Sequence, residues 1–175
     1  MENLRELSQQ FAVDGRLEMI VLRPDRRKPA TAVPMVEAVL GYGLMGDRRS
    51  QTERTTESSR KREVTLIQAE HIPLIAQWGG LASLNPLDLR RNLIISGINL
   101  IAMKSPFSDL KLHCQIGDRV ELVITGPCDP CSRMEQELGR GVYNAMRGHG
   151  GMTARLVTGG PIAVGDRVRC RLVSS

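Results

Sequence analysis

The sequence is a succession of short apolar runs, each interrupted within a few residues by glycine, proline or aspartate. Apolar runs of this length, bounded by turn-forming residues, are typical of β-strands. Many short strands joined by turns predict a mainly β domain, built as a barrel or a sandwich. We expect strands at residues 17–22, 32–40, 64–67, 93–95, 120–124, 156–157 and 168–173.

Apolar residues recur at helical spacing in three places. The first predicts an N-terminal helical extension over residues 1–16, on the outside of the domain, and the others predict helices over 68–78 and 132–138. A chain of 175 residues suits one domain. The expected fold is therefore a single domain, residues 1–175, that is mainly β with peripheral helices (α+β).

Residues 47–63, DRRSQTERTTESSRKRE, form a polar stretch without apolar periodicity. This composition predicts a flexible polar loop on the surface. Two interpretations of the loop remain open, a solvated connection between strands and a lid over a substrate site.

Two segments share a local pattern, QIGDRVEL at 115–122 and AVGDRVRC at 163–170. In each, Gly-Asp predicts a tight turn directly ahead of a strand. The flanking sequences do not match, so we interpret the pair as turns of the β framework rather than as a full internal repeat.

The chain is basic: 24 Lys and Arg against 19 Asp and Glu give a net charge of +5 and a pI near 9.4. This charge favours anionic partners. The aromatic residues are only one Trp, two Tyr and two Phe, which leaves few platforms for stacking bases. A small basic nucleic-acid-binding barrel is therefore the least favoured function for this chain.

No apolar run approaches the roughly 20 residues that cross a bilayer, and the opening MENLRELSQQ lacks the features of a secretion signal. We expect a cytoplasmic protein with no membrane partner. A cytoplasmic setting keeps cysteines reduced, so each of the four is a packing residue, a metal ligand or a reactive thiol. They are Cys114, Cys128, Cys131 and Cys170.

The segment GPCDPCSRME, residues 126–135, follows a predicted strand and opens a predicted helix. Ser132 and Glu135 fit the S-x-x-E capping box, which places Cys131 just before the helix cap. Free amide donors, the helix dipole and Arg133 would stabilise a thiolate there, so we predict a lowered pKa for the Cys131 thiol. A thiolate is both a nucleophile and a soft metal ligand.

Cys128 and Cys131 form a C-x-x-C pair with three competing interpretations. A structural zinc site is incomplete, because no second C-x-x-C or H-x-x-x-H follows. A thioredoxin-like dithiol lacks the surrounding βαβ pattern. The interpretation that we favour is one functional thiol with an accessory neighbour.

Residues 140–155, RGVYNAMRGHGGMTAR, combine clustered glycines with arginines and His149. Glycines allow close backbone approach, and arginine binds phosphate through paired planar donors, so the segment suits an anion cradle. A glycine-rich turn between a helix and a strand, with solvated arginines, fits the composition equally well.

Four segments in this order resemble the MOSC domain, named for the C-terminal domain of molybdenum cofactor sulfurase. They are GLMGDRRS (43–50), LRRNLIISGINL (89–100), GPCDPCSRME (126–135) and AMRGHGGMTARLVTGGPIAVGD (145–166). The resemblance implies a MOSC-type β-barrel. It also implies a cysteine that carries sulfur or ligates the molybdenum of a pyranopterin cofactor, and Cys131 is the matching position.

The same resemblance maps the cofactor-binding residues of the family onto this chain, and His149 joins them from the glycine-rich segment. They are Arg48, Arg91, Asn92, Arg133, Arg147, His149 and Arg155. Pyridoxal phosphate binding is associated with the family through the desulfurase domain of eukaryotic sulfurases, for which 175 residues leave no room. Two departures from the family pattern are Arg49, where histidine often follows Gly-Asp-Arg, and the additional thiol of Cys128.

The leading functional hypothesis is a standalone protein that binds the molybdenum cofactor or carries sulfur, with Cys131 as catalytic residue, metal ligand or persulfide site. The alternative is a molybdenum-dependent reductase of N-hydroxylated bases or amines. The first hypothesis implies a cysteine desulfurase or another sulfur donor as partner. The second implies an electron-transfer partner, because no flavin or iron–sulfur motif is present.

Overall fold

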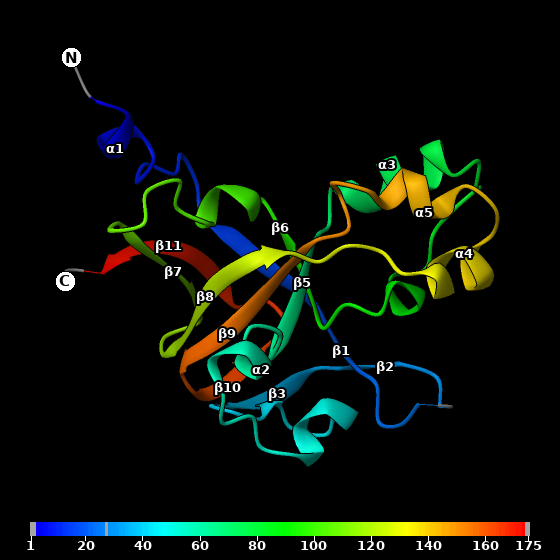
Figure 1. Ribbon diagram of the computed structural model, residues 1–175, viewed down its shortest axis with the longest axis horizontal. Helices are drawn as coiled ribbons and strands as arrows, with labels where there is room; N and C mark the ends of the chain where they lie inside the picture. The colour runs from blue at the N-terminus through cyan, green and yellow to red at the C-terminus, as the bar shows by residue number, and fades with distance from the viewer. Residues whose placement is uncertain (1–2, 27, 174–175) are drawn as a thin grey trace.

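Strands predominate in residues 3–26 and 28–173, the part of the chain that the computed structural model describes (Figure 1). They are β1 (Gly15–Leu22), β2 (Thr31–Val33), β3 (Met35–Val39), β4 (Gly43–Leu44), β5 (Val64–Gln68), β6 (Leu93–Ser96), β7 (Lys111–Ile116), β8 (Val120–Pro127), β9 (Met152–Thr158), β10 (Gly160–Ala163) and β11 (Arg167–Val173). The α-helices are α1 (Leu4–Leu7), α2 (Glu57–Arg60), α3 (His71–Trp78), α4 (Ser132–Leu138) and α5 (Val142–Met146), with 3₁₀ turns η1 (Arg48–Gln51), η2 (Pro86–Leu89) and η3 (Ile101–Met103).

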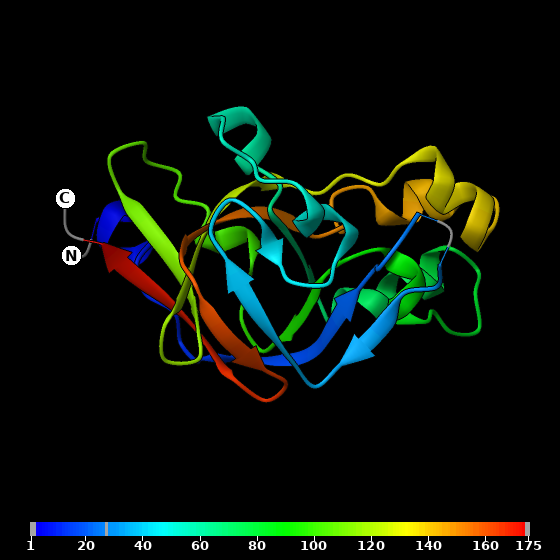
Figure 2. The ribbon, with the colours of Figure 1, turned by 90° about the horizontal axis from the view of Figure 1, so that it is seen from below.

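Seven of these strands close into a barrel. Hydrogen-bonded neighbours follow the order β11-β7-β8-β9-β5-β6-β1, and β11 also pairs with β1, which closes the ring. Strand β2 pairs antiparallel with the last residues of β1, while β10, β3 and β4 form a separate small sheet. Figure 2 shows the strands winding around the barrel, with α4 and α5 (yellow to orange) at one end. The predicted mainly β barrel with peripheral helices is confirmed.

A β-bulge divides the apolar residues of β1 between two cores. The register shifts between Leu17 and Met19 where β1 pairs with β6, so Leu17 and Ile20, three residues apart, both face the barrel interior. Val21 then points to the other side and joins a second apolar cluster. Each fully buried Leu, Ile or Val side chain contributes about 1.5–3 kcal/mol to the free energy of unfolding.

The second cluster lies between the outside of the barrel and the helices. Helix α3 contributes Ile72, Ile75 and Ala76, and α5 contributes Val142 and Met146. Helix α4 adds Met134 to the same cluster, so α4 and α5 are held at one end of the barrel, where the loop that follows β8 leaves it. In the described part of the chain, no helix reaches the length and apolarity that crossing a bilayer requires.

The predicted helical extension over residues 1–16 is wrong in length. Helix α1 spans Leu4–Leu7, with Asn3 and Glu6 forming a capping box, and residues 1–2 lie outside the described residues. Phe11 packs against the barrel core from an irregular segment, and Gly15 already belongs to β1. Leu4 and Leu7 are exposed, so the apolar spacing corresponds neither to a continuous helix nor to a buried face.

The stretch 47–63 is not a bare loop. It contains η1 and α2, and Asp47, Ser50 and Glu63 are buried along it. Glu63 accepts hydrogen bonds from the Leu156 main chain at 2.7 Å and from Arg60 at 2.6 Å. Buried polar groups that find partners anchor the segment to the barrel.

Other differences from the prediction have local causes. Pro34 divides the predicted strand 32–40 into β2 and β3, because proline has no N–H to donate to a sheet. Strand β7 has His113 and Gln115 on one face and so lacks a continuous apolar run. The helices over 68–78 and 132–138 are confirmed as α3, which starts at His71, and α4.

Candidate functional site

The loop that follows β8 presents two cysteines in different environments. Cys128 is 2% exposed, and its main-chain N–H donates to the Gly151 carbonyl at 2.8 Å. Cys131 is exposed and occupies the N-cap position of α4 in extended conformation. The Cys128 side chain is therefore buried, and the Cys131 side chain is open to solvent.

The predicted capping box at the start of α4 is wrong. Cys131 itself is the N-cap and its side chain makes no capping hydrogen bond, while Ser132 is the first helical residue. Glu135 instead accepts hydrogen bonds from the main-chain N–H groups of Gly141 and Tyr143, at 2.7 and 2.9 Å. These bonds lower the pKa of the Glu135 carboxyl and tie α4 to the start of α5.

Arg91 holds the cysteine loop, residues 128–131 between β8 and α4, in place. Its guanidinium donates to three main-chain carbonyls, those of Gly150 at 2.6 Å, Leu89 at 3.0 Å and Cys128 at 2.9 Å. The side chain is buried, and burial lowers the Arg91 pKa, while the thiols of Cys128 and Cys131 act in the opposite direction. Arg91 therefore lies close enough to both sulfurs to interact with them electrostatically, while its hydrogen bonds go to main-chain carbonyls.

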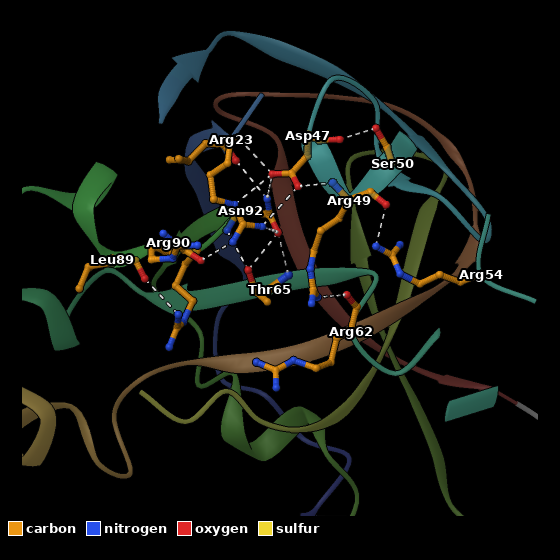
Figure 3. A network of polar contacts seen from close by, with 12 residues as sticks. Arg23, Asp47, Arg49, Ser50, Arg54, Arg62, Thr65, Leu89, Arg90 and Asn92 are labelled. Carbon is orange, nitrogen blue, oxygen red and sulfur yellow. Dashed lines mark hydrogen bonds and ion pairs between the residues drawn. The ribbon is translucent and has the colours of Figure 1, made fainter. Parts of the chain in front are cut away.

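Asn92 belongs to a buried polar network (Figure 3). Its amide donates to Asp47 at 3.0 Å and to the Val21 carbonyl, and its oxygen accepts from Thr65 at 3.0 Å. Asp47 also pairs with Arg23 at 3.1 Å. The network joins β1, β5, the start of β6 and η1, so Asn92 supports the site from within the protein.

The stretch before β5 brings further arginines to the same place. The Arg62 guanidinium donates to Cys128 Sγ at 3.5 Å, within reach of a sulfur hydrogen bond, and the Arg62 carbonyl accepts from Arg49 at 3.1 Å (Figure 3). Burial lowers the pKa of Arg49, and the nearby charges of Arg54, Arg23, Arg62 and Arg48 lower it further. Like charges held this close favour binding of an anion.

Two of these arginines, Arg23 and Arg48, border a cavity of about 380 Å³, which we call the basic cleft. Its charged lining comprises the basic residues Arg23, Arg26, Lys28, Arg48, Arg90 and Arg133 and the acidic residues Asp25, Asp88 and Glu137. Six positive and three negative side chains leave an excess of 6 − 3 = +3. Helix α4 supplies Arg133 to the cleft, and Cys131, the N-cap of this helix, lies two residues earlier in the chain.

Two residues of the cleft show unsatisfied or strained geometry. Arg48 Nε is buried and finds no hydrogen-bond partner among residues 3–26 and 28–173. Arg90 has a φ of 58°, in the left-handed region that non-glycine residues rarely adopt. A strained backbone and a buried donor without an acceptor both cost free energy, and strained residues cluster at active sites and ligand-binding sites.

The other predicted residues lie elsewhere. Arg147 lines a separate cavity with Asp129 and Pro130, beside the cysteine loop. The His149 ring lies 4.9 Å from each of the His71 and Trp78 rings, measured between centroids, and makes edge contacts with both.

Arg155 pairs with Glu57 at 3.2 Å. It lines another cavity, against the outside of β7 and β8. The predicted cofactor-binding set is therefore only partly gathered, with Arg48 and Arg133 in the basic cleft and Arg91 and Asn92 supporting it.

Sequence reasoning missed Arg23, Arg62 and Arg90. Arg90 directly precedes the predicted Arg91, and Arg23 stands between a predicted strand and Pro24, so both positions offered a weak signal. Arg62 falls within the predicted polar loop. Within the described residues, no group of three or more His, Cys, Asp or Glu side chains is placed to hold a metal ion.

Comparison with known protein families matches the MOSC domain to residues 53–169. Among solved structures, the YuaD protein from Bacillus subtilis is similar with a TM-score of 0.72 and 18% sequence identity, over 93% of this chain and 98% of that one. No significant match is found among curated protein sequences.

Two further structures carry the same likeness. YiiM from Escherichia coli gives a TM-score of 0.62 at 16% identity, over 91% of this chain and 70% of that one. YiiM from Geobacillus stearothermophilus gives 0.64 at 14% identity, over 91% and 75%. At these identities the likeness shows the fold.

Proposed function

The chain belongs to the MOSC domain family, and on that premise we propose that it binds the molybdenum cofactor at the basic cleft, with Cys131 as the metal ligand. MOSC domains are associated with molybdenum-cofactor-related function. One observation carries the proposal for this chain. An exposed cysteine is the N-cap of the helix that supplies Arg133 to a cleft with a net positive lining, and this cleft holds a buried guanidinium N–H without a partner among residues 3–26 and 28–173.

The residues of the cleft fit the phosphate of a pyranopterin. Arg48, Arg90 and Arg133 line it, and Arg48 Nε lacks an acceptor within the described chain. A phosphate oxygen would satisfy that donor, and paired arginine donors match phosphate geometry. Arg23 is held by Asp47, so it adds charge from a fixed position.

The chemistry of Cys131 fits the metal. Thiolate sulfur is a soft donor, and on binding the thiol would release its proton and leave an anionic ligand. When bound, the cofactor supplies a metal that changes oxidation state. The exposed position of Cys131 leaves room for a large group, whereas Cys128 is buried. Arg91 holds the carbonyl of Cys128 and thereby positions the loop.

The test is reconstitution with cofactor released from a donor molybdoenzyme. Bound pterin is measured by its fluorescence after oxidation, and bound molybdenum by elemental analysis, for the parent, Cys131→Ser and Cys170→Ser. Cys170 lies in β11 on the barrel, so its variant is the matched thiol control. We expect equal pterin and molybdenum in the parent and the control, and at least a tenfold loss of molybdenum in Cys131→Ser.

Retention of molybdenum by Cys131→Ser at the parent level would contradict the proposal. Mass spectrometry of the Cys131 peptide, from protein purified without reductant, tests the sulfur-carrier role of the same thiol. One added sulfur atom on that peptide, together with no bound molybdenum in the parent, would assign Cys131 as a persulfide site supplied by a sulfur donor.

A further inference from the structure

The two Gly-Asp-Arg turns meet at a second cavity, away from the basic cleft. The main-chain N–H of Gly117 donates to the Arg167 carbonyl at 2.9 Å, and a Cβ on Gly117 would lie 2.9 Å from Asp166 Oδ2. The β7–β8 and β10–β11 turns are therefore in direct contact. They line a cavity of about 480 Å³. In Figure 1, β8 and β10 lie on the left and α4 on the far right.

Three arginines line this cavity, and one of them lacks an acceptor. Arg169 Nε is buried and has no hydrogen-bond partner in the described chain. Its cross-strand neighbour is Gln115, whose amide donates to the Asp118 carbonyl and whose oxygen accepts from Arg171. Gln115 thus makes two side-chain hydrogen bonds, and neither is with Arg169. A buried guanidinium N–H without an acceptor is costly, and an anionic oxygen would satisfy it.

The local charge favours an anion as well. Arg16 and Arg167 lie directly opposite each other on β1 and β11, where like charges are unfavourable. Each forms one ion pair at the surface, Arg16 with Glu18 at 3.8 Å and Arg167 with Asp14 at 3.5 Å. Among the residues described, the Arg119 side chain has no hydrogen bond or ion pair, and it lines the cavity with Arg167 and Arg169.

The carboxylates of the cavity do not neutralise this charge. Asp166 accepts a hydrogen bond from the Ala163 main chain at 2.8 Å, which holds the turn. Asp118 is exposed on the β7–β8 turn. Three arginines against these two aspartates leave 3 − 2 = +1 in the lining. The remaining wall is apolar and includes Met35 and Pro161.

The geometry points to a second ligand site, in which Arg119, Arg167 and Arg169 bind the phosphate of a small phosphomonoester and Met35 and Pro161 cover its apolar part. Planar arginine forks suit a phosphate with several oxygens, and the apolar wall favours an organic group over a bare ion. This site is independent of Cys131 and of the proposed cofactor cleft, and it gives the paired turns a binding role in addition to a structural one.

The test is a titration followed by amide NMR signals, with inorganic phosphate, phenyl phosphate and sodium acetate as probes at constant ionic strength. We expect phosphate to shift the signals of Gly117 and Gly165, phenyl phosphate to bind more tightly, and acetate to have little effect. Arg119→Gln and Arg169→Gln should each weaken phenyl phosphate binding about tenfold, the loss of one charge-assisted contact. Arg48→Gln, in the basic cleft, is the matched control and should leave these two signals unaffected.

Arg119 is exposed on a turn, so its variant reports on binding even if Arg169→Gln disturbs the fold. Unchanged affinity in the Arg119 variant, equal shifts with acetate, or phenyl phosphate binding no tighter than phosphate would overturn the inference. Shifts confined to Arg90 and Arg133 would also overturn it, while agreeing with an anion in the basic cleft. The Gly117 and Gly165 signals report on this site alone, so they test it even if the cofactor proposal fails.

Discussion

The Arg91 guanidinium donates to the main-chain carbonyl of Cys128 at 2.9 Å. Arg91 lies just before the start of β6, and Cys128 lies in the loop that leads from β8 to α4, so this bond joins two separate segments of the chain. The same guanidinium holds the Gly150 carbonyl at 2.6 Å, on the other side of that loop. The buried Arg91 side chain therefore holds in place the backbone that leads to Cys131.

Replacing Arg91 should loosen this support. Arg91→Gln removes hydrogen bonds to buried carbonyls, and we expect the free energy of unfolding to fall by about 3 kcal/mol. Urea denaturation measures this directly. Arg140→Gln, at an exposed position, is the control and should change the free energy by less than about 0.5 kcal/mol. A loss of similar size in both variants would contradict the anchoring role.

Native-state alkylation should rank the four thiols. Cys131 is exposed, whereas Cys114 is fully buried and Cys128 is 2% exposed. Burial raises the pKa of the partly buried Cys170 to about 11, which slows its reaction because the thiolate is the nucleophile. Peptide mass spectrometry after brief iodoacetamide treatment should find the label on Cys131 first. Labelling of Cys128 or Cys114 at the same rate would contradict the arrangement.

The barrel thiols predict a loss of stability at alkaline pH. Burial raises the pKa of Cys114 to about 12, and Cys170 adds to the shift. Above about pH 8.5 an unfolded thiol ionises while the folded one keeps its proton, so the folded state binds more protons and stability falls as pH rises. Below pH 8.5 this contribution is constant.

The expected slope from Cys114 is about 1.4 kcal/mol of unfolding free energy per pH unit between pH 9 and 11. Cys114→Ala should remove that slope while lowering stability at pH 7, since it leaves a small cavity. Urea denaturation of both proteins across this range checks the difference. Parallel pH profiles for the two proteins would contradict the raised pKa.

Replacing Arg48 should weaken cofactor binding without lowering the stability of the fold. Because Arg48 Nε is buried without an acceptor in the described chain, Arg48→Gln should leave the free energy of unfolding unchanged or raise it by about 1 kcal/mol. The same variant should weaken retention of reconstituted pterin about tenfold, the loss of one charge-assisted contact. A strongly destabilised variant would show instead that the side chain supports the fold.

More of the fold than of the site could be predicted from the sequence. Short apolar runs and helical spacing indicated most strands and the helices α3 and α4, because burial on one face leaves a periodic signal. Helix α5 escaped, since glycines surround its five residues. Strand β7 has no continuous apolar run, because polar His113 and Gln115 alternate with its apolar residues, and this alternation is the signal that could have predicted it.

The site depends on contacts between distant segments. Arg23, Arg62 and Arg90 come from three separate stretches that meet only when the barrel closes, and sequence spacing carries no sign of that meeting. Arg155 was predicted to belong to the site, but the structure places it elsewhere. It is close in sequence to the glycine-rich segment, but β9 rises about 3.3 Å per residue and carries Arg155 away from the loop, to a cavity beside β8.

The most direct test of the central claim is the molybdenum K-edge absorption of the cofactor-loaded parent and of Cys131→Ser under conditions where both retain pterin. If Cys131 ligates the metal, the parent should show one more sulfur neighbour at the molybdenum than the variant, in which oxygen or an open position replaces it. Identical sulfur coordination in the two proteins would contradict the account.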